Sequence, residues 1–554
     1  MLQFKKTFYV LIALIPFTSF AQDSTYRGKE FWAGYGHHQF MEPGQSNNQE
    51  LAFYLCAQNQ PAIVTITVDS ATVPWSRTYN VAANSVVISD LIPKSGSSDA
   101  RLYSIPVSLG GTSSTGLFRR KGIHIQSDVP IAVYSHLYGS ASAGASLLLP
   151  VSSWGYTYQS VNSAQRYASN CFSWAYVIAQ ADSTLVEITP SQITRAQTLT
   201  GLQAGVATNI LLQKGQIYAV LGDIVGSGPD GYELTGTKIR SLSTGKPIAV
   251  FSGSSRTSNP ASCGSGGGDN DMVQVFPFHI WGNNYLTAPL PSSSSASFAS
   301  TSSIKIMVND PTTVVTRNGV ALTGLINNSY YKYESNTADY IRADKPIMVA
   351  QFISGGGCTQ GLGDPEMFYL SPIEGAIKKA TGVRTNREGI SINYALVIIP
   401  TTGISSLLID GSATFNHSYA HPNIPGYSVV IKSWTSAVTQ FTVQSDSAFT
   451  GLSFGMGPVE SYGYNLGADF QKSNDLDPLV RLAWTGGQST DWFNANNWNM
   501  GRIPNATDVI FIPAGKPFSP HVPAGQIAHC KSITVEQGAN VTVGINAQLD
   551  ITKN

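Results

Sequence analysis

The chain has 554 residues, of which 42% are hydrophobic and only 12% are charged. This apolar content is enough for several packed cores, so the sequence is not that of a disordered protein, and its length allows more than one domain. The 33 basic and 33 acidic residues balance, which gives no electrostatic reason to expect a nucleic acid or an anionic membrane surface as partner.

Residues 1–21 have the pattern of a secretory signal peptide. A basic pair, Lys5 and Lys6, precedes an apolar stretch that ends in small residues at Ala21. No later apolar run reaches the ~18 residues that a membrane-spanning helix needs. We therefore expect a protein that is secreted or held at the cell surface after cleavage near Ala21, with no membrane insertion.

Between about Phe31 and Phe470 the chain repeats one pattern four times. The pattern is an apolar strand pair, a polar stretch, a strand leading into Pro-Ile-x-Val, and an apolar run that ends at an aromatic–Gly turn. The Pro-Ile-x-Val signature begins at Pro130, Pro247 and Pro346, and the fourth unit has lost it. Self-similarity at a domain-sized period indicates like units in tandem, which favours a binding or spacer surface over one catalytic cleft.

The ends of the units also correspond. Trp follows Pro by four residues at Pro150 and Trp154 and again at Pro277 and Trp281. A third, degenerate copy without the Trp surrounds Pro372. These landmarks predict four repeats, at residues 22–155, 156–284, 285–384 and 385–470.

The periodicity within each unit is that of strands. Alternating runs such as Ile63 to Val68 recur between clusters of Gly, Pro, Asn and Ser, and no segment keeps an apolar helical period. We predict an all-β protein of tandem β-sandwich-like repeats. A propeller-like ring is the alternative, because a blade and half a sandwich have similar strand patterns.

A different region follows a polar linker at residues 471–481. Residues 482–554 hold short strands at close spacing, with Gly and Asn between them and three Trp near the start: Trp484, Trp492 and Trp498. This pattern predicts a β-solenoid-like module with an aromatic cap. The last expected rung has nothing after it to cover it, so we expect the module to be incomplete or to pack on its neighbour.

Five cysteines occur in a chain expected to reach an oxidising compartment. Cys263 and Cys358 both lie in Gly-rich loops after the signature strand, and Cys56 and Cys171 both lie near opening strands. Of the three connectivities for these four, we prefer Cys56 with Cys171 and Cys263 with Cys358. Buried or free thiols are the alternative, and no CxxC spacing supports redox catalysis or a zinc site.

Acidic residues lie in matched Gly-rich loops of the second and third units, Asp269 and Asp271 in one and Asp364 and Glu366 in the other. Oxygen ligands on flexible loops suit Ca²⁺, so these four residues are a candidate calcium site. The alternative is that they accept hydrogen bonds from loop backbone amides.

Three motifs of enzymes have weak support. Ser453 lies in a GxSxG pattern, but no helical run follows to form a nucleophile elbow. Gly226 to Gly231 fits GxGxxG, yet Pro229 denies the helix that would hold a pyrophosphate. His37 and His38 are candidate metal ligands, but they are adjacent, so in a strand their side chains point to opposite faces. We expect no catalytic residues and no cofactor other than possible calcium.

Residues from about Lys29 to Phe470 resemble the IgGFc-binding domain family of secreted surface proteins. The segments that carry the resemblance are Gly28–Phe31, Val129–Val133, Leu149–Gly155, Gly245–Gly253, Cys263 with Asp271–Pro277, and Trp281–Gly282. The tail, with Trp484-Thr-Gly and Asn497-Trp498, looks like a module of extracellular bacterial proteins. The resemblance implies adhesion or ligand capture outside the cell and names no catalytic residue.

The expected function is therefore that of a non-catalytic adhesion or ligand-binding protein whose partner is an extracellular protein or glycan. An extracellular polysaccharide hydrolase is one alternative, and it requires paired carboxylates in a cleft at separations of ~5 to 9 Å. A structural spacer within a larger surface protein is the other.

Overall fold

The computed structural model describes residues 26–551 except for residues 71, 106–110, 140, 166, 196–200, 259, 264–267, 293, 436, 470–481, 500, 501, 507 and 537. The expected signal peptide at 1–21 and the expected linker at 471–481 lie outside the described residues. Strands account for 48% of the structure, which confirms the all-β prediction.

The first repeat is a seven-stranded sheet in the order β4-β3-β7-β2-β5, with β1 and β8 also paired to β7. Its strands are β1 (Gly28–Ala33), β2 (Glu50–Cys56), β3 (Ala62–Val68), β4 (Trp75–Val81), β5 (Val86–Ile88), β7 (Ile123–Tyr138) and β8 (Ala143–Leu147), with short helical turns η1 (Gln39–Met41) and η2 (Gly96–Ser98). One further strand in this part of the chain, β6 (Gly116–Phe118), joins a sheet of the next repeat.

The long strand β7 is shared between two layers. Its first half pairs with β1 and β3, and its second half pairs with β2 and β8. The β3 ladder ends at Ser127 and the β2 ladder begins at Ala132, so Pro130 lies where the partners change. Proline has no N–H to give to a ladder, and this position needs none. The Pro-Ile-x-Val signature therefore marks the point where the strand passes from one layer to the other.

The second repeat divides the same elements between two sheets, of order β16-β15-β10-β13-β6 and β12-β11-β14-β9. Here the long strand is broken into β14 and β15. The strands are β9 (Thr157–Gln159), β10 (Ser173–Ala179), β11 (Thr184–Thr189), β12 (Thr208–Leu212), β13 (Ile217–Leu221), β14 (Lys238–Ser241), β15 (Ile248–Thr257) and β16 (Asp269–Gln274).

The third and fourth repeats are again seven-stranded sheets built on one long strand each, β22 and β29. The third contains β17 (Gly282–Leu286), β18 (Ser302–Val308), β19 (Val315–Arg317), β20 (Val320–Ala321), β21 (Tyr330–Ser335), β22 (Tyr340–Ile353), α1 (Gly356–Thr359) and β23 (Glu366–Tyr369). The fourth contains β24 (Ile377–Arg384), η7 (Arg387–Gly389), β25 (Ile392–Pro400), η8 (Thr401–Ser406), β26 (Leu408–Ile409), β27 (His417–Ala420), β28 (Tyr427–Thr435), β29 (Thr439–Gly457) and β30 (Glu460–Asn465).

Besides β17, which straddles the expected boundary at residue 284 and pairs with β22 of the third repeat, two strands lie on the other side of a repeat boundary expected from the sequence. β24 was placed in the third repeat, within 285–384, but it pairs with β29 and so belongs to the fourth. β6 lies within the expected first repeat, at 22–155, but it pairs with β13 of the second. Strand pairing assigns β24 and β6 to these repeats, and the sequence pattern does not reveal which strands pair.

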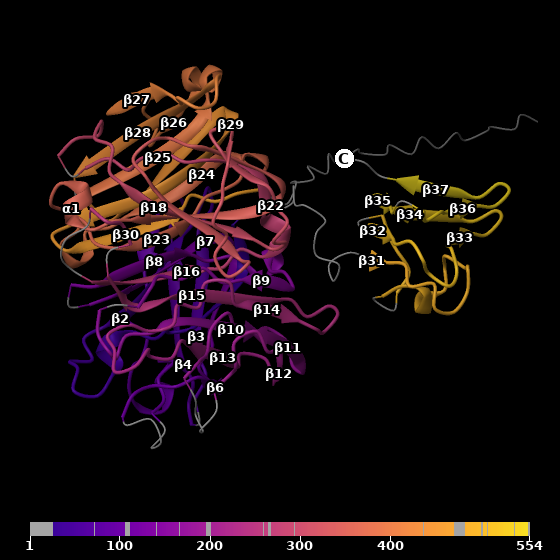
Figure 1. Ribbon diagram of the computed structural model, residues 1–554, viewed down its shortest axis with the longest axis horizontal. Helices are drawn as coiled ribbons and strands as arrows, with labels where there is room; N and C mark the ends of the chain where they lie inside the picture. Colours follow the sequence, from indigo (N-terminus) through magenta and orange to yellow (C-terminus); the bar gives the residue numbers. More distant parts are fainter. Residues whose placement is uncertain are drawn as a thin grey trace, which may run out of the picture.

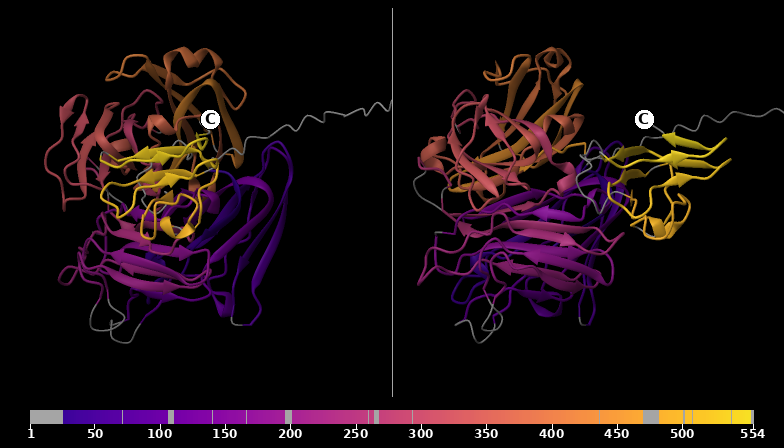
Figure 2. Two further views of the ribbon diagram at one scale, coloured as in Figure 1. Left: turned by 90° about the vertical axis from the view of Figure 1, so that its right-hand side faces the viewer. Right: turned by 45° about the vertical axis from the view of Figure 1, so that its right-hand side comes forward.

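The last strands of the four repeats meet at the centre of the molecule. β8 lies against β16 and β30, and β23 lies against the same two strands, so the four close a ring (Figure 1). The first and second repeats form one half of the body and the third and fourth the other half (Figure 2). The two-layer repeats thus agree with the predicted β-sandwich-like units, and their last strands pack together at the centre of the body.

Short Pro-initiated turns connect successive repeats. They are η4 (Val151–Ser153), η5 (Phe278–Ile280) and η6 (Ile373–Gly375), and Pro150, Pro277 and Pro372 begin them with φ and ψ near −65° and 156°. Pro277 and Pro372 each pack on the glycine at the preceding connection, and Pro150 packs on Gly28 of β1. A Cβ added at Gly282 would lie 2.2 Å from Cβ of Pro372, and one at Gly155 would lie 2.5 Å from that of Pro277. Only glycine permits this approach.

A tyrosine then joins two of these connections to the signature strand. The Gly282 amide donates a hydrogen bond to the Tyr285 hydroxyl (3.1 Å), which donates to the Ile347 carbonyl (2.7 Å). Tyr158 makes the same bridge from Gly155 (2.8 Å) to the carbonyl of Ile248. We call this arrangement the tyrosine bridge.

The ring closes between the first and fourth repeats. The Thr381 amide donates to the Tyr26 hydroxyl (2.8 Å), and Gly467, at φ +109°, packs on the Tyr26 ring. The start of the first repeat and the end of the fourth therefore lie side by side.

The C-terminal region has its own cluster of buried apolar residues, which includes Trp484, Trp492 and Trp498. Its strands pair in parallel: Val509 lies opposite Ser532, and Ile527 lies opposite Gln548. Its elements are β31 (Leu482–Ala483), η9 (Ala495–Asn497), β32 (Val509–Ile512), β33 (His521–Val522), β34 (Ile527–Cys530), β35 (Ser532–Val535), β36 (Thr542–Val543) and β37 (Gln548–Ile551).

Candidate functional site

The loops that join each long strand to the last strand of its repeat lie at one end of the ring. They connect β7 to β8, β15 to β16, β22 to β23 and β29 to β30. The Ser142 hydroxyl donates to Asn270 of β16 (2.9 Å), and the Asp364 amide donates to the Ser461 hydroxyl of β30 (2.9 Å), so two of the loops contact the last strand of another repeat. We call the surface formed by the described residues of these loops the axial loop face.

A disulfide crosses this face. Cys263, in the loop of the second repeat, is bonded to Cys358, in that of the third. The other expected pair is wrong, because Cys56 and Cys171 are buried and unbonded within the described structure. Cys56 ends β2 in the first repeat's sheet, whereas Cys171 precedes β10 in the second repeat's sheet. Corresponding places in two repeats are separate places in space, so they need not meet.

The strand registers place four polar residues at corresponding positions beneath the axial loop face. Leu147, Gln274 and Tyr369 each pair with the fourth residue after the signature proline, and Asn465 pairs with Leu452 at the corresponding place in the fourth repeat. Five residues before each of them stand Ser142, Asp269, Asp364 and Glu460, one from each repeat. All four are buried.

Burial, together with neighbouring carboxyl groups at Asp269 and Glu460, raises the pKa values of the carboxyl groups in this region. Asp269 accepts a hydrogen bond from the Ala143 amide, while its Oδ2 atom is buried without a partner among the described residues. Burial and the neighbouring Asp364 and Glu460 raise the pKa of Asp269 well above its usual value. Burial also raises the pKa of Asp364 to about 6 and that of Glu460 to about 8. These are protonatable groups inside the ring.

The predicted calcium ligands do not form a metal site in the described structure. In its described parts, no three His, Cys, Asp or Glu side chains are arranged to hold a metal ion. Glu366 accepts from the amides of Ala145 (2.9 Å) and Met367 (2.7 Å), and Asp271 accepts from the Ser163 hydroxyl. Asp269 and Glu366 thus match the alternative expectation, in which acidic side chains bind backbone amides.

A cation–aromatic stack lies at the edge of the axial loop face. The Arg256 guanidinium lies over the rings of Tyr167 (4.2 Å) and Phe40 (5.5 Å), and its Nε donates to the Gly268 carbonyl (2.8 Å). Tyr167 is 40% exposed. Such stacks hold both partners in one orientation and leave an aromatic edge for contact. The sequence analysis did not single out these residues.

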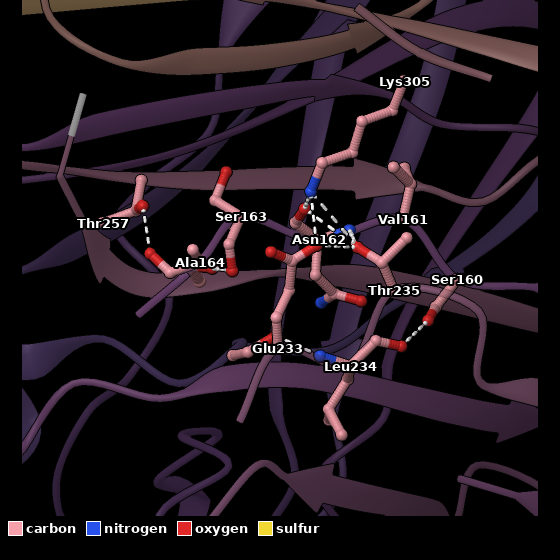
Figure 3. Close-up of polar contacts among 12 residues, drawn as sticks. Ser160, Val161, Asn162, Ser163, Ala164, Glu233, Leu234, Thr235, Thr257 and Lys305 are labelled. Carbon is pink, nitrogen blue, oxygen red and sulfur yellow. Dashed lines mark hydrogen bonds and ion pairs between the residues drawn. The ribbon is translucent and has the colours of Figure 1, made fainter. Parts of the chain in front are cut away.

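A second polar cluster ties the second repeat to the third (Figure 3). Lys305, on β18, is 3% exposed, and its ammonium group donates to the Asn162 carbonyl and pairs with Glu233. The ammonium also lies 5.3 Å from the centre of the Phe352 ring. A buried ammonium requires such partners. Lys305 is the one charged residue of an apolar strand, a signal that could have identified it in the sequence.

The other residues noted in the sequence are structural. His37 contacts Ser255 (2.7 Å) and Glu42 (2.7 Å), and His38 contacts Asn270 (3.2 Å). Ser453 is fully buried within β29, far from the exposed turn of a nucleophile elbow. The segment from Gly226 to Gly231 is a turn, closed by a hydrogen bond from the Val225 amide to the Asp230 carbonyl (2.8 Å).

Fused β-repeats that present their loops on one face form a scaffold of the kind that binds other molecules through loops. The family comparison agrees with this class. Residues 144–455 match the model of the IgGFc binding protein family, and the chain belongs to this family. The match runs from β8 to β29, so it covers the second and third repeats and most of the fourth. The family is one of extracellular, protein-binding domains.

Residues 483–554 match a domain of unknown function, DUF8693. No curated protein and no solved structure matches the chain. Within the described residues, no helix is long and apolar enough to cross a membrane.

Proposed function

We propose that this protein is a non-catalytic adhesion or ligand-binding protein, secreted or held at the cell surface after cleavage near Ala21, that binds an extracellular protein through the axial loop face. The observation that carries the proposal is the gathering of loops from all four repeats at one end of the ring, with the Cys263–Cys358 bond across two of them.

Three observations support the proposal: one concerns the axial loop face itself, one concerns the stack at its edge, and one concerns the charge of the chain. Its loops rise from a closed ring of strands and are cross-linked, which lowers the conformational entropy lost on binding. Tyr167 is exposed and held by Arg256, and tyrosine and arginine are enriched among residues that contribute most to protein–protein affinity. The balanced charge of the chain suits a partner held by aromatic and polar contacts rather than by a strong field.

The hydrolase alternative has less support. Ser453 is buried in a strand, and the carboxyl groups of Asp269, Asp364 and Glu460 are buried inside the ring rather than facing a cleft. A glycosidase needs its two carboxyl groups on either side of a substrate.

The test is binding of the full chain to immobilised immunoglobulin G, its Fc fragment and mucin, with a glycan array in parallel. Tyr167→Ala is expected to lower affinity for the bound protein at least tenfold. Leu211→Ala is the matched control, because Leu211 is 54% exposed on β12, outside the axial loop face.

Loss of binding in Leu211→Ala with unchanged binding in Tyr167→Ala would contradict the proposal and would show that the partner binds the outer strands around β12. Binding to glycans alone would replace the protein partner with a carbohydrate.

A further inference from the structure

A pocket of about 230 Å³ lies between the third and fourth repeats. It uses no residue of the axial loop face. Its walls are mainly apolar and come from both repeats, with Leu286, Ile373, Ala376, Ile398, Tyr427 and Phe449 among them. A pocket of this size holds one or two small rings rather than an extended chain.

Comparison of the three Pro-initiated turns shows that the third turn lacks a tryptophan present in the other two. Each of the three Pro-initiated turns ends at a residue with almost the same backbone conformation: Trp154 (φ −73°, ψ 153°), Trp281 (φ −63°, ψ 145°) and Ala376 (φ −64°, ψ 144°). Ala376 therefore stands where the two preceding connections have tryptophan.

In those two connections the indole is packed inside the protein. Trp281 is 2% exposed and Trp154 is 5% exposed. The Trp281 ring lies 4.5 Å from that of Phe278, the first residue of its turn. The first residue of the third turn is Ile373, which lines the pocket together with Ala376. The two residues of the third turn that correspond to Phe278 and Trp281 therefore form part of the pocket wall.

In the two preceding connections a carbonyl accepts the ring N–H, whereas the corresponding residue of the third connection, Ser371, does not line the pocket. The indole nitrogen donates to the carbonyl five residues earlier in both cases, Trp154 to Leu149 (3.1 Å) and Trp281 to Phe276 (3.2 Å). The corresponding carbonyl before Ala376 is that of Ser371.

We propose that this pocket binds a free planar aromatic molecule of indole size. Large-to-small replacements in packed interiors leave apolar cavities that take up aromatic molecules of matching shape. The methyl group of Ala376 already occupies the place of a tryptophan Cβ, so the space fits the ring alone and not a side chain attached to another backbone.

The test uses the full chain with a fluorinated indole, followed by fluorine NMR and by the thermal unfolding midpoint. The wild-type protein is expected to broaden the fluorine signal and to unfold at higher temperature with increasing indole. Ala376→Trp fills the pocket from within and is expected to abolish both effects. Ala376→Leu, a smaller change, is expected to weaken them if the tryptophan variant does not fold.

Trp281→Ala provides a matched gain of function. Removing the indole from the preceding connection is expected to lower the unfolding midpoint, to add a second indole site, and to let indole restore part of the lost stability. Indole binding that Ala376→Trp and Ala376→Leu leave unchanged would overturn the proposal. So would the absence of any indole effect on the wild type, or tighter binding of N-acetyltryptophanamide than of indole.

Discussion

Lys305 of the third repeat and Glu233 of the second form an ion pair in which the lysine is almost fully buried. The ammonium group also donates to the Asn162 carbonyl, so one side chain holds two segments of the neighbouring repeat. The second and third repeats are therefore joined by a buried polar contact.

Lys305→Ala is expected to lower the free energy of unfolding by about 3 kcal/mol, since it leaves buried acceptors without their cation. The double variant Lys305→Met, Glu233→Gln keeps the volume and removes both charges, so it is expected to lose much less. Urea unfolding of the variants and the wild type measures both values. Equal losses in the two variants would show that packing, not the charge pair, stabilises this boundary.

The tyrosine bridge predicts a second effect on stability. Tyr285→Phe removes the hydroxyl that joins Gly282 to Ile347, which leaves a buried amide and a buried carbonyl short of one partner each. The expected loss is about 1–3 kcal/mol in the free energy of unfolding. Tyr419→Phe is the control, because the Tyr419 hydroxyl has no hydrogen bond within the described structure, and its removal is expected to change stability little.

The carboxyl groups inside the ring predict an unusual response to pH. The pKa of Glu460 is raised from 4.5 to about 8 by burial and by the neighbouring Glu388 and Asp364, with Arg256 opposing. The folded protein thus favours the protonated form, and this contribution to stability is full below pH 4.5 and is lost as the pH rises toward 8. For one group the slope is about 1.4 kcal/mol per pH unit.

Glu460→Gln keeps the shape and removes the charge. It is expected to be more stable than the wild type near pH 8 and equal to it near pH 4.5, as measured by thermal unfolding across this range. A stability difference that does not change with pH would show that Glu460 does not titrate in the folded protein.

The Cys263–Cys358 bond predicts a response to reduction. The double variant Cys263→Ser, Cys358→Ser is expected to unfold more easily, by a few kcal/mol, and its axial loops are expected to be cut faster by protease. Cys56 and Cys171 are buried, and burial raises the pKa of Cys171 to about 12, so neither is expected to react with an alkylating reagent before unfolding. Mass spectrometry of the alkylated folded protein checks this, and rapid labelling of Cys171 would contradict it.

The sequence predicted the all-β class because strand periodicity and turn residues are local properties. It also predicted the landmarks of the repeats, since Pro130 and Pro346 mark the place where a long strand changes layers. It did not predict that β24 pairs with β29, because ladder partners depend on the packed fold rather than on one strand's residues.

The sequence predicted only some of the polar residues at and beneath the axial loop face, because it reveals local patterns and not contacts between distant segments. Asp269 and Asp364 were found because their loops match in composition, but Glu460 was missed because its loop is only two residues long. Arg256 and Tyr167 meet only in the folded protein, and nothing in their local sequence indicates the contact.

Because Tyr26 and Gly467 lie against each other, the chain enters and leaves the ring at one place. A pull on the two ends of the body would load this junction first, and the repeats around the ring would carry little of the force while it holds. If the protein connected a surface to a distant partner, the ring would keep its length under load until the contact between Tyr26 and Gly467 broke.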